Sequence, residues 1–416
     1  MGAQFRHEAY SYLESDFGTS SITKSSFEPA RKVYAGFVEL RLPLIGEQKD
    51  TNGSAILEAS LTDRYEHYSD FGDTNNPQFG LIYQPLPTLK FRGTAGTSFR
   101  APLLSDLNPI PSQAVVLPLN DPASGSYSCF PFSNTSTCTN TVSVFGGNPN
   151  LGPEKARSWT VGFDWAPEGS TGFRAGGTYY NITFRDRIAN PSGLITYLYA
   201  LENETILGPK IVQRNPAIGI IQQISQTPGF INPFGINLAT IDALVDYREN
   251  NLSVVKTSGI DLDLSWRFST FGGDVEAGGT TTKIIKFENR FSSLTPLTSL
   301  LNTPFNPIDL KIRSRLIYSR GQISIGLYGN YVDSYSDNRS GLNIPVASWA
   351  TFDANARYKW EGVFGGQGSA TLMAGINNFT NRNPPFLYNP IFNVNFDGAN
   401  ANALGRMIYM QCSISW

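Results

Sequence analysis

The segment Ile260–Phe268 reads IDLDLSWRF, and apolar and polar residues alternate along its whole length. Alternation with a period of two is typical of a β-strand that has one apolar and one polar face. The apolar face carries Ile260, Leu262, Leu264, Trp266 and Phe268. The same pattern closes the sequence in MIYMQCSISW, from Met407 to Trp416. A chain dominated by such segments is predicted to be all-β.

Segments of this kind occur about 14 times, and helical periodicity is almost absent. Most have about ten residues or more, whereas strands of soluble proteins average roughly 5–6. A tilted strand that crosses a membrane needs about 9–11 residues. The predicted strands cover roughly residues 3–14, 31–44, 54–65, 78–84, 88–99, 155–165, 172–187, 255–268, 274–287, 308–318, 322–334, 347–360, 369–379 and 405–416.

The connections between these strands alternate in length. Short ones lie near residues 45–53, 86–87, 166–170, 269–273, 319–321 and 361–368. Long ones cover 15–30, 66–77, 100–154, 188–254, 288–307, 335–346 and 380–404. Alternate connections of an up-and-down barrel lie at the same end, so one end is predicted to carry tight turns and the other long loops. Outer-membrane barrels have this asymmetry.

Alternation alone does not distinguish a membrane barrel from a soluble sandwich, because the apolar face meets lipid in one and the core in the other. Four of the six tryptophans favour the membrane, since they fall at the short-turn ends of strands: Trp165, Trp266, Trp360 and Trp416. Indole prefers the membrane interface, where its ring is half apolar and its N–H stays hydrated. An antiparallel transmembrane β-barrel is therefore predicted, with a soluble β-rich binding protein as the competing interpretation.

Composition excludes several functions. The formal net charge of −2 is not the basic footprint of a nucleic-acid-binding protein. The sequence contains no run of about 18 apolar residues, so no transmembrane helix is predicted. The only histidines, His7 and His67, lie far from any nucleophile motif, so neither a His-dependent triad nor a zinc hydrolase is indicated. We expect no enzyme, no cofactor and no metal site.

Two of the three cysteines bound a short polar loop. Cys129 and Cys138 enclose CFPFSNTSTC, which is rich in Ser, Thr, Asn and Pro. A disulfide forms readily across such a loop in an oxidising compartment. The alternative is a pair of unrelated loop thiols.

Five landmarks together resemble the C-terminal part of a TonB-dependent outer-membrane receptor. Their order along the chain is that of the family's barrel. They are GTSFRAP (Gly96–Pro102), GNPNLGPEKARSWTVGFDW (Gly147–Trp165), YYNITFRDRI (Tyr179–Ile188), GINNFTNRNPPF (Gly375–Phe386) and GRMIYMQCSISW (Gly405–Trp416).

The resemblance implies a 22-stranded barrel filled by an N-terminal plug, in the outer membrane of a Gram-negative bacterium. No plug and no TonB-contacting segment is recognised, so residues 1–416 are predicted to be the C-terminal portion of such a barrel, lacking the plug and the early strands. A self-contained barrel of about 14 strands is the competing explanation. Without a plug, this chain alone is not expected to carry out energised uptake.

The resemblance also implies function and partners. A complete receptor would bind a scarce solute, such as a siderophore, a vitamin or an oligosaccharide, and admit it with energy passed through TonB and the plug. The other partners are outer-membrane lipid and the barrel assembly machinery, which recognises a final strand with a terminal aromatic, here containing Ile414 and Trp416. A passive pore or a surface-adhesion barrel is the alternative function.

Ligand recognition is predicted in the long outer loops, because a rigid barrel positions variable loops well. Arg100 lies where a strand meets a long loop, and aromatic residues follow within loops 100–154 and 188–254: Tyr127, Phe130, Phe132, Tyr197 and Tyr199. Aromatic rings there either stack on sugars or chelator rings or pack the loops together. Charged residues on the polar strand faces are predicted to line the lumen, where they contact a plug, wet the channel or pair among the barrel strands.

Overall fold

The computed structural model describes residues 1–17, 22–47, 55–107, 113–125, 129, 138–169, 172–193, 195–227, 229–339, 341–363, 368–388 and 395–415. Four predicted site residues lie outside these ranges: Tyr127, Phe130, Phe132 and Trp416. No helix in the described ranges is long and apolar enough to cross a membrane.

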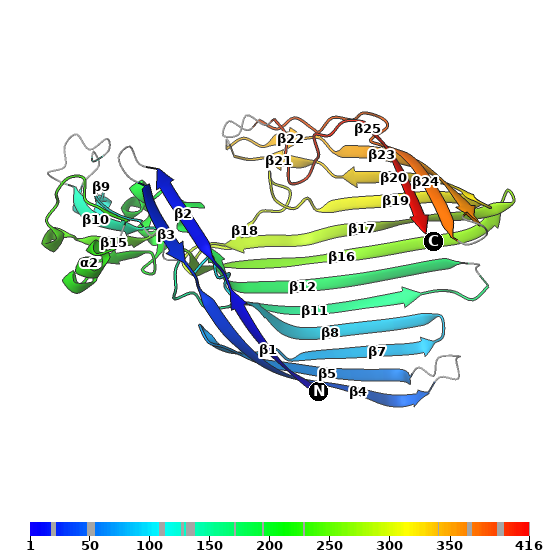
Figure 1. Ribbon diagram of the computed structural model, residues 1–416, viewed down its shortest axis with the longest axis horizontal. Helices are drawn as coiled ribbons and strands as arrows, with labels where there is room; N and C mark the ends of the chain where they lie inside the picture. The colour runs from blue at the N-terminus through cyan, green and yellow to red at the C-terminus, as the bar shows by residue number, and fades with distance from the viewer. Residues whose placement is uncertain are drawn as a thin grey trace.

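One large antiparallel sheet dominates the molecule (Figure 1). Its hydrogen-bonded path contains fourteen strands, as the alternation predicts. In order they are β1 (Gly2–Ala9), β4 (Ala30–Glu47), β5 (Ala55–Tyr68), β7 (Gln78–Leu86), β8 (Leu89–Arg100), β11 (Glu154–Trp165), β12 (Phe173–Ala189), β16 (Asn250–Thr270), β17 (Gly273–Arg290), β19 (Leu310–Arg320), β20 (Ile323–Val332), β23 (Trp349–Glu361), β24 (Ser369–Asn377) and β25 (Met407–Ser415). Short strands β6 (Gly72–Asn75) and β18 (Thr298–Ser299) pair with β5 and β17.

The sheet curves around a hollow and has β1 and β25 as its two edges (Figure 1). Among the described residues no ladder joins these two edges. Neighbouring strands pair antiparallel throughout, so short turns gather at one end of the sheet and long connections at the other, as predicted.

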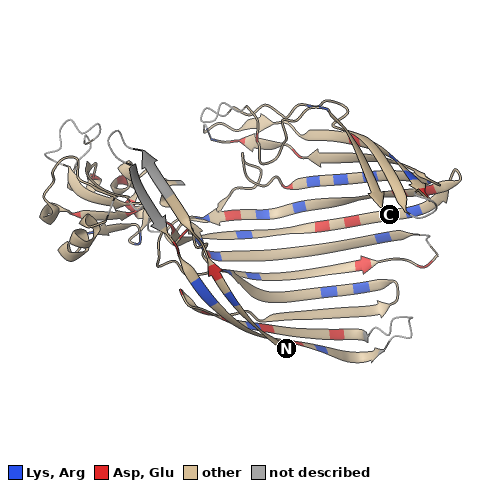
Figure 2. Ribbon diagram, viewed as in Figure 1, with Lys and Arg blue, Asp and Glu red and all other residues tan. Residues whose placement is uncertain are grey.

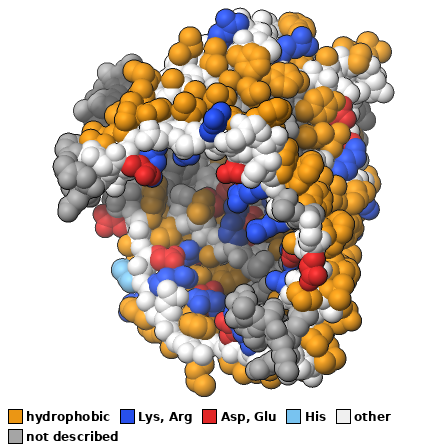
Figure 3. Space-filling model, turned by 90° about the vertical axis from the view of Figure 1, so that its right-hand side faces the viewer, with side chains coloured by type: hydrophobic (Ala, Val, Ile, Leu, Met, Phe, Trp, Pro, Cys, Tyr) orange, Lys and Arg blue, Asp and Glu red, His pale blue; other side chains and the backbone are white. Residues whose placement is uncertain are grey.

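The two faces of the sheet have opposite character. Large apolar side chains on the convex face are exposed, for example Leu262 (43%), Leu264 (51%) and Phe352 (47%). Charged residues recur along the strands (Figure 2), and Figure 3 shows charged side chains inside the hollow with apolar ones around it. A soluble sandwich would bury its large apolar residues. The inverted arrangement is that of a membrane barrel, whose apolar face meets lipid.

This assignment of faces predicts opposite effects of arginine at two adjacent positions of β16. Leu262→Arg places a charge on the lipid-facing side and should destabilise the folded protein by about 2–4 kcal/mol. Asp263→Arg places the same side chain in the hollow and should be tolerated. Unfolding in urea, followed by the heat-dependent shift in gel mobility, measures both. Equal destabilisation by the two substitutions would contradict the assignment.

The first predicted strand, 3–14, is wrong in extent. The chain leaves the large sheet after β1, and β2 (Tyr12–Phe17) pairs with β3 (Ile22–Phe27) in a separate hairpin. Residues 15–30 are therefore not simply a loop. Alternation continues across the boundary because both β1 and β2 are strands, so the pattern does not mark where the pairing partner changes. A second hairpin, β21 (Tyr335–Asp337) with β22 (Ile344–Val346), occupies another predicted loop.

A small mixed sheet is the main departure from prediction. Segments 100–154 and 188–254, both predicted as loops, together build five strands in the order β13-β15-β10-β9-β14. Two of the pairings are parallel, β10 with β15 and β9 with β14. The strands are β9 (Gln113–Leu119), β10 (Thr139–Val144), β13 (Val212–Arg214), β14 (Gly229–Ile231) and β15 (Ala243–Asp246). We call this sheet and its covering segments the outer subdomain; it lies beyond the long-loop end of the large sheet (Figure 1).

Short helices complete the outer subdomain. They are α1 (Glu204–Leu207), α2 (Ile218–Ser225) and the 3-10 turns η1 (Pro122–Ser124), η2 (Pro191–Gly193), η3 (Tyr197–Tyr199), η4 (Leu201–Asn203) and η5 (Leu238–Thr240). One apolar cluster packs Leu119, Leu207 and Val245 on one side of the mixed sheet, and a second packs Val116, Val142 and Ile221. The outer subdomain therefore has its own core, unlike the hollow sheet that carries it.

Candidate functional site

The core of the outer subdomain is organised around Tyr247, which is fully buried. Its hydroxyl donates a hydrogen bond to the carbonyl oxygen of Ile195 at 2.7 Å. Burial raises the pKa of Tyr247, so the phenol stays neutral and remains a donor. Phe145 packs edge-on against Tyr197, with ring centroids 4.9 Å apart, beside Tyr247. Residues from both long connections thus share one aromatic core.

A cluster of charged side chains joins the two long connections, 100–154 and 188–254, by ion pairs and hydrogen bonds. The Arg214 guanidinium, at the end of β13, donates to both carboxylate oxygens of Asp121 at 2.6 and 3.1 Å. It also donates to Glu204 at 2.7 Å. Asp121 is nearly inaccessible, with 3% of its side chain exposed, and accepts further hydrogen bonds from the Thr139 hydroxyl and the Ala123 backbone N–H. All the lone pairs of a buried carboxylate are engaged, as its burial requires.

These hydrogen bonds shift the pKa values of Asp121 and Arg214. Burial alone would raise the pKa of Asp121, but hydrogen bonds from Arg214 and Thr139 outweigh it and hold that pKa below its ordinary value of 3.8. The same contacts raise the pKa of Arg214, led by its hydrogen bonds to Asp121. The pair is therefore fully ionised at neutral pH.

The GNPNLGPE stretch joins the outer subdomain to the large sheet. Asn251 donates to the Gly152 carbonyl at 2.9 Å and accepts from the Gly152 N–H at 2.8 Å. The Asn148 amide donates to the Glu249 carbonyl at 2.9 Å. Glu154 is buried and accepts from the Ile188 N–H at 2.8 Å. The motif thus ties the start of β11 to the end of β12 and the start of β16.

Two of the residues predicted to bind a ligand have partners within the protein. Arg100 forms an ion pair with the buried Glu154, its register partner across β8 and β11. Tyr197 is half-buried in the aromatic core. Tyr199 is exposed on the outer subdomain, with 42% of its surface accessible. Ligand binding by these residues remains a prediction, and Arg100 and Tyr197 also hold the loops in place.

A disulfide joins Cys129 to Cys138, with Cα atoms 5.9 Å apart. Cys129 is buried, and its backbone N–H donates to the Asn120 side chain at 2.7 Å. The crosslink therefore lies next to Asp121, between η1 and the start of β10.

The predicted membrane-interface residues lie near the short-turn end of the sheet, and one of them, Trp165, also lines a cavity on the concave face. Trp165, Trp266 and Trp360 are 43%, 48% and 44% exposed, and Ile414 is 51% exposed. Other rings accompany the indoles, because Trp266 packs on Phe268 and Trp360 on Tyr358, each with centroids 4.4 Å apart. A band of aromatic residues at this level is what an interface requires.

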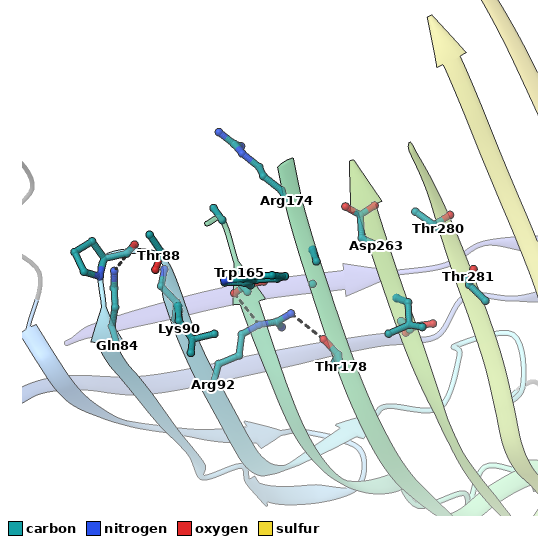
Figure 4. A pocket seen from close by; sticks show the side chains of 18 of the residues that line it. Gln84, Thr88, Lys90, Arg92, Trp165, Arg174, Thr178, Asp263, Thr280 and Thr281 are labelled. Carbon is teal, nitrogen blue, oxygen red and sulfur yellow. Dashed lines mark hydrogen bonds and ion pairs between the residues drawn. The ribbon is translucent and has the colours of Figure 1, made fainter. Parts of the chain in front are cut away.

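The concave face contains a cavity of about 770 Å³ near the short-turn end (Figure 4). Side chains from β8, β12, β16 and β17 point into it, among them Lys90, Arg92, Arg174 and Asp263. Arg92 donates to Asp164 at 3.2 Å and to the Thr178 hydroxyl at 2.8 Å. This wall is polar, and its charges are of both signs.

Further along the lumen wall, charges pair between strands. Glu276 accepts from Arg267 at 2.9 Å and from Arg315 at 2.8 Å. The Thr282 hydroxyl donates to Asp261 at 2.7 Å. These contacts are the network among barrel strands that was one of the predicted alternatives. No group of three or more His, Cys, Asp or Glu side chains in the described ranges is arranged to hold a metal ion.

Known proteins show where this architecture occurs. An enterobactin-bound mutant of the ferric enterobactin receptor PfeA from Pseudomonas aeruginosa is similar over 94% of this chain, with a TM-score of 0.59 and 15% identity. The siderophore receptor PirA from Acinetobacter baumannii is similar over 94%, with a TM-score of 0.58 and 14% identity. The iron transporter FrpB from Neisseria meningitidis is similar over 94%, with a TM-score of 0.50 and 16% identity.

At these identities the similarity shows the fold. The chain spans 46% of each of those three structures, or about half their length. The comparison with curated proteins finds no match. Residues 1–379 match the family described as "TonB dependent receptor-like, beta-barrel". The chain therefore belongs to the β-barrel part of the TonB-dependent receptor family.

Proposed function

We propose that the protein acts as an outer-membrane receptor that takes up a scarce solute with energy passed through TonB, in a Gram-negative bacterium. The observation that carries this proposal is that one chain combines a sheet with an apolar outer face, a charged hollow and a separately packed outer subdomain. The apolar face would hold the protein in the membrane. The outer subdomain would capture a hydrated solute, and the charged hollow would let it pass. Such a role is transport rather than catalysis.

The names of the similar proteins support an iron chelate as the solute, since they include two siderophore receptors and an iron transporter. Vitamins and oligosaccharides remain within the proposed range. The exposed Tyr199 would face the solute from the outer subdomain. Outer-membrane lipid would surround the aromatic band, and the barrel assembly machinery would insert the strands.

Uptake in matched hosts tests this function. The full-length gene product that contains residues 1–416 is expressed in a Gram-negative host with TonB and in its isogenic TonB-deficient derivative. The protein should sediment with the outer membrane, and uptake of one of a panel of labelled ferric chelates, cobalamin and oligosaccharides should occur only with TonB.

The passive-pore alternative gives a different result. Uptake that persists without TonB, together with a steady open conductance of the purified protein in planar bilayers, would overturn the receptor proposal. A protein that is recovered soluble and monodisperse without detergent would overturn the membrane assignment itself.

A further inference from the structure

A second cavity, of about 490 Å³, lies on the concave face at the long-loop end of β19, β20, β23, β24 and β25. A smaller cavity of about 290 Å³ adjoins it and shares Arg313, Asn330 and Asp353 in its lining. We call the two together the β19 groove. Its larger cavity lies at the long-loop end, on the side from which a solute would enter, whereas its smaller cavity shares Thr280 with the cavity of Figure 4.

Positive charge in this groove is not neutralised by ion pairs. Lys311, Arg313 and Arg315 alternate along β19 and share its lumen face. Arg315 is paired with Glu276 at 2.8 Å. Lys311 instead donates to the uncharged amide of Asn400 at 3.0 Å. Neither Lys311 nor Arg313 forms an ion pair with a carboxylate of the described residues, so both charges are available to an anion.

Asp353 is the one carboxylate among the described residues that line the groove, and it does not cancel these two charges. Both oxygens of Asp353 are occupied by hydrogen-bond donors, the Asn378 backbone N–H at 2.6 Å and the Asn330 amide at 3.0 Å. The described side chains that line the larger cavity include two cations, Lys311 and Arg313, and this single anion. The outer end of the groove therefore keeps a net positive charge.

Side-chain amides supply the rest of the polar lining. Asn330, Asn377 and Asn402 line the larger cavity together with two further asparagines. Asn402 accepts from the Leu404 N–H through its oxygen, which leaves its amide hydrogens for another partner. An amide offers both donors and acceptors, which suits hydroxyl groups. Trp349 and Met407 add apolar surface to the same lining.

We propose that the β19 groove binds a solute in which a carboxylate is joined to several hydroxyls. Lys311 and Arg313 would hold the carboxylate, and Asn330, Asn377 and Asn402 would hydrogen-bond the hydroxyls. Acidic oligosaccharides and hydroxycarboxylate chelates of iron both have this chemistry. The inference rests on the proposed receptor function and narrows its solute class.

Binding to the purified full-length protein in detergent tests the groove without any need for transport. Titration calorimetry is run with trigalacturonate, ferric citrate and, as a neutral sugar, maltotriose. At least one of the two anions should bind, and affinity should fall as salt rises, because the contact is partly electrostatic. Lys311→Gln with Arg313→Gln should weaken binding by about 10-fold or more, since each removed contact is a charge-assisted hydrogen bond.

A matched variant distinguishes loss of the proposed contacts of Lys311 and Arg313 from a general loss of positive charge in the lumen. Arg267→Gln removes one positive charge from the lumen at the other end of the sheet, where Arg267 is paired with Glu276, and should leave affinity unchanged. All variants should keep the heat-dependent gel shift of the folded protein. Trigalacturonate binding alone identifies an acidic sugar as the source, and ferric citrate binding alone identifies an iron chelate.

Three results would overturn the groove assignment. They are equal affinity for maltotriose and the anions, unchanged affinity in the Lys311 and Arg313 double variant, and no binding of either anion. These outcomes are separate from failure of the proposed function. Binding without TonB-dependent uptake would keep the groove and overturn the receptor, whereas TonB-dependent uptake with no effect of the double variant would keep the receptor and overturn the groove.

Discussion

Tyr247→Ala should open the outer subdomain while the fourteen-stranded sheet stays folded. The side chain is fully buried, its ring contacts Phe145 and Tyr197, and its hydroxyl satisfies the Ile195 carbonyl. Truncating a buried aromatic to alanine costs about 3–5 kcal/mol. Because the outer subdomain has its own core, the loss should remain local. Hydrogen exchange should show β9, β10 and β15 losing protection and β16 and β17 keeping it.

Tyr199→Ala is the matched control for that experiment. Tyr199 lies in the same outer subdomain but is 42% exposed. Its truncation should change stability by less than about 0.5 kcal/mol. Unchanged protection of β9 and β15 in Tyr247→Ala would contradict the role of Tyr247, and loss of protection across β16 would contradict the independence of the two cores.

Arg214→Met should loosen the outer subdomain at neutral pH by about 3 kcal/mol, because it leaves the Asp121 carboxylate buried without its cation. We expect the lower end of the range for a broken buried pair, since 27% of the Arg214 side chain is exposed. Lys210→Met removes a charge from an exposed position of the same outer subdomain and should have little effect. Protease cleavage of the disulfide-intact protein, followed with increasing urea, measures both.

Acid should reduce the difference between Arg214→Met and the wild type. The pKa of Asp121 is lowered in the folded protein, so the pair stabilises the protein above the ordinary pKa of 3.8 and loses that contribution as pH falls through the lowered value. The variant lacks this pair, so wild type and variant should begin to converge as pH falls below 3.8 and should meet only below the lowered pKa of Asp121. Asp121→Asn in the Arg214→Met background should recover part of the loss at neutral pH. A loss that is the same at acid and neutral pH would contradict this account.

The strands of the large sheet were predictable because their signal is local. The alternation in Ile260–Phe268 specifies two faces without reference to any partner, and β16 extends it at both ends to Asn250–Thr270. The face assignment was predictable as well, since tryptophans mark the short-turn end. The split between β1 and β2 was not, because it depends on where β4 begins, at Ala30, the partner of Ala9.

The outer subdomain escaped prediction for a physical reason. Its strands have only 3–7 residues, and two of its pairings are parallel, joining segments distant in sequence. QAVVLPL in β9 is an apolar run, which was the one available signal. The contacts of the predicted site residues were not predictable for a similar reason. The sequence indicates Arg100 but not its partner Glu154, and Tyr197 but not Tyr247, because each pair joins residues that are distant in sequence. Lys311 and Arg313 were visibly on one face, but the asparagines that complete the groove come from three other strands or connections.

The parallel pairing of β10 with β15 imposes an order on folding. It places Thr141 beside Ala243, about a hundred residues later, and β11 and β12 cross the large sheet between them. Contacts so distant in sequence form slowly, because the loop must close before they contribute. The Cys129–Cys138 bond spans only nine residues and can close early. During biogenesis, β9 and β10 should therefore pair first, next to the disulfide. The edge of β10 that later pairs with β15 should stay unpaired until the segment 188–254 has been added.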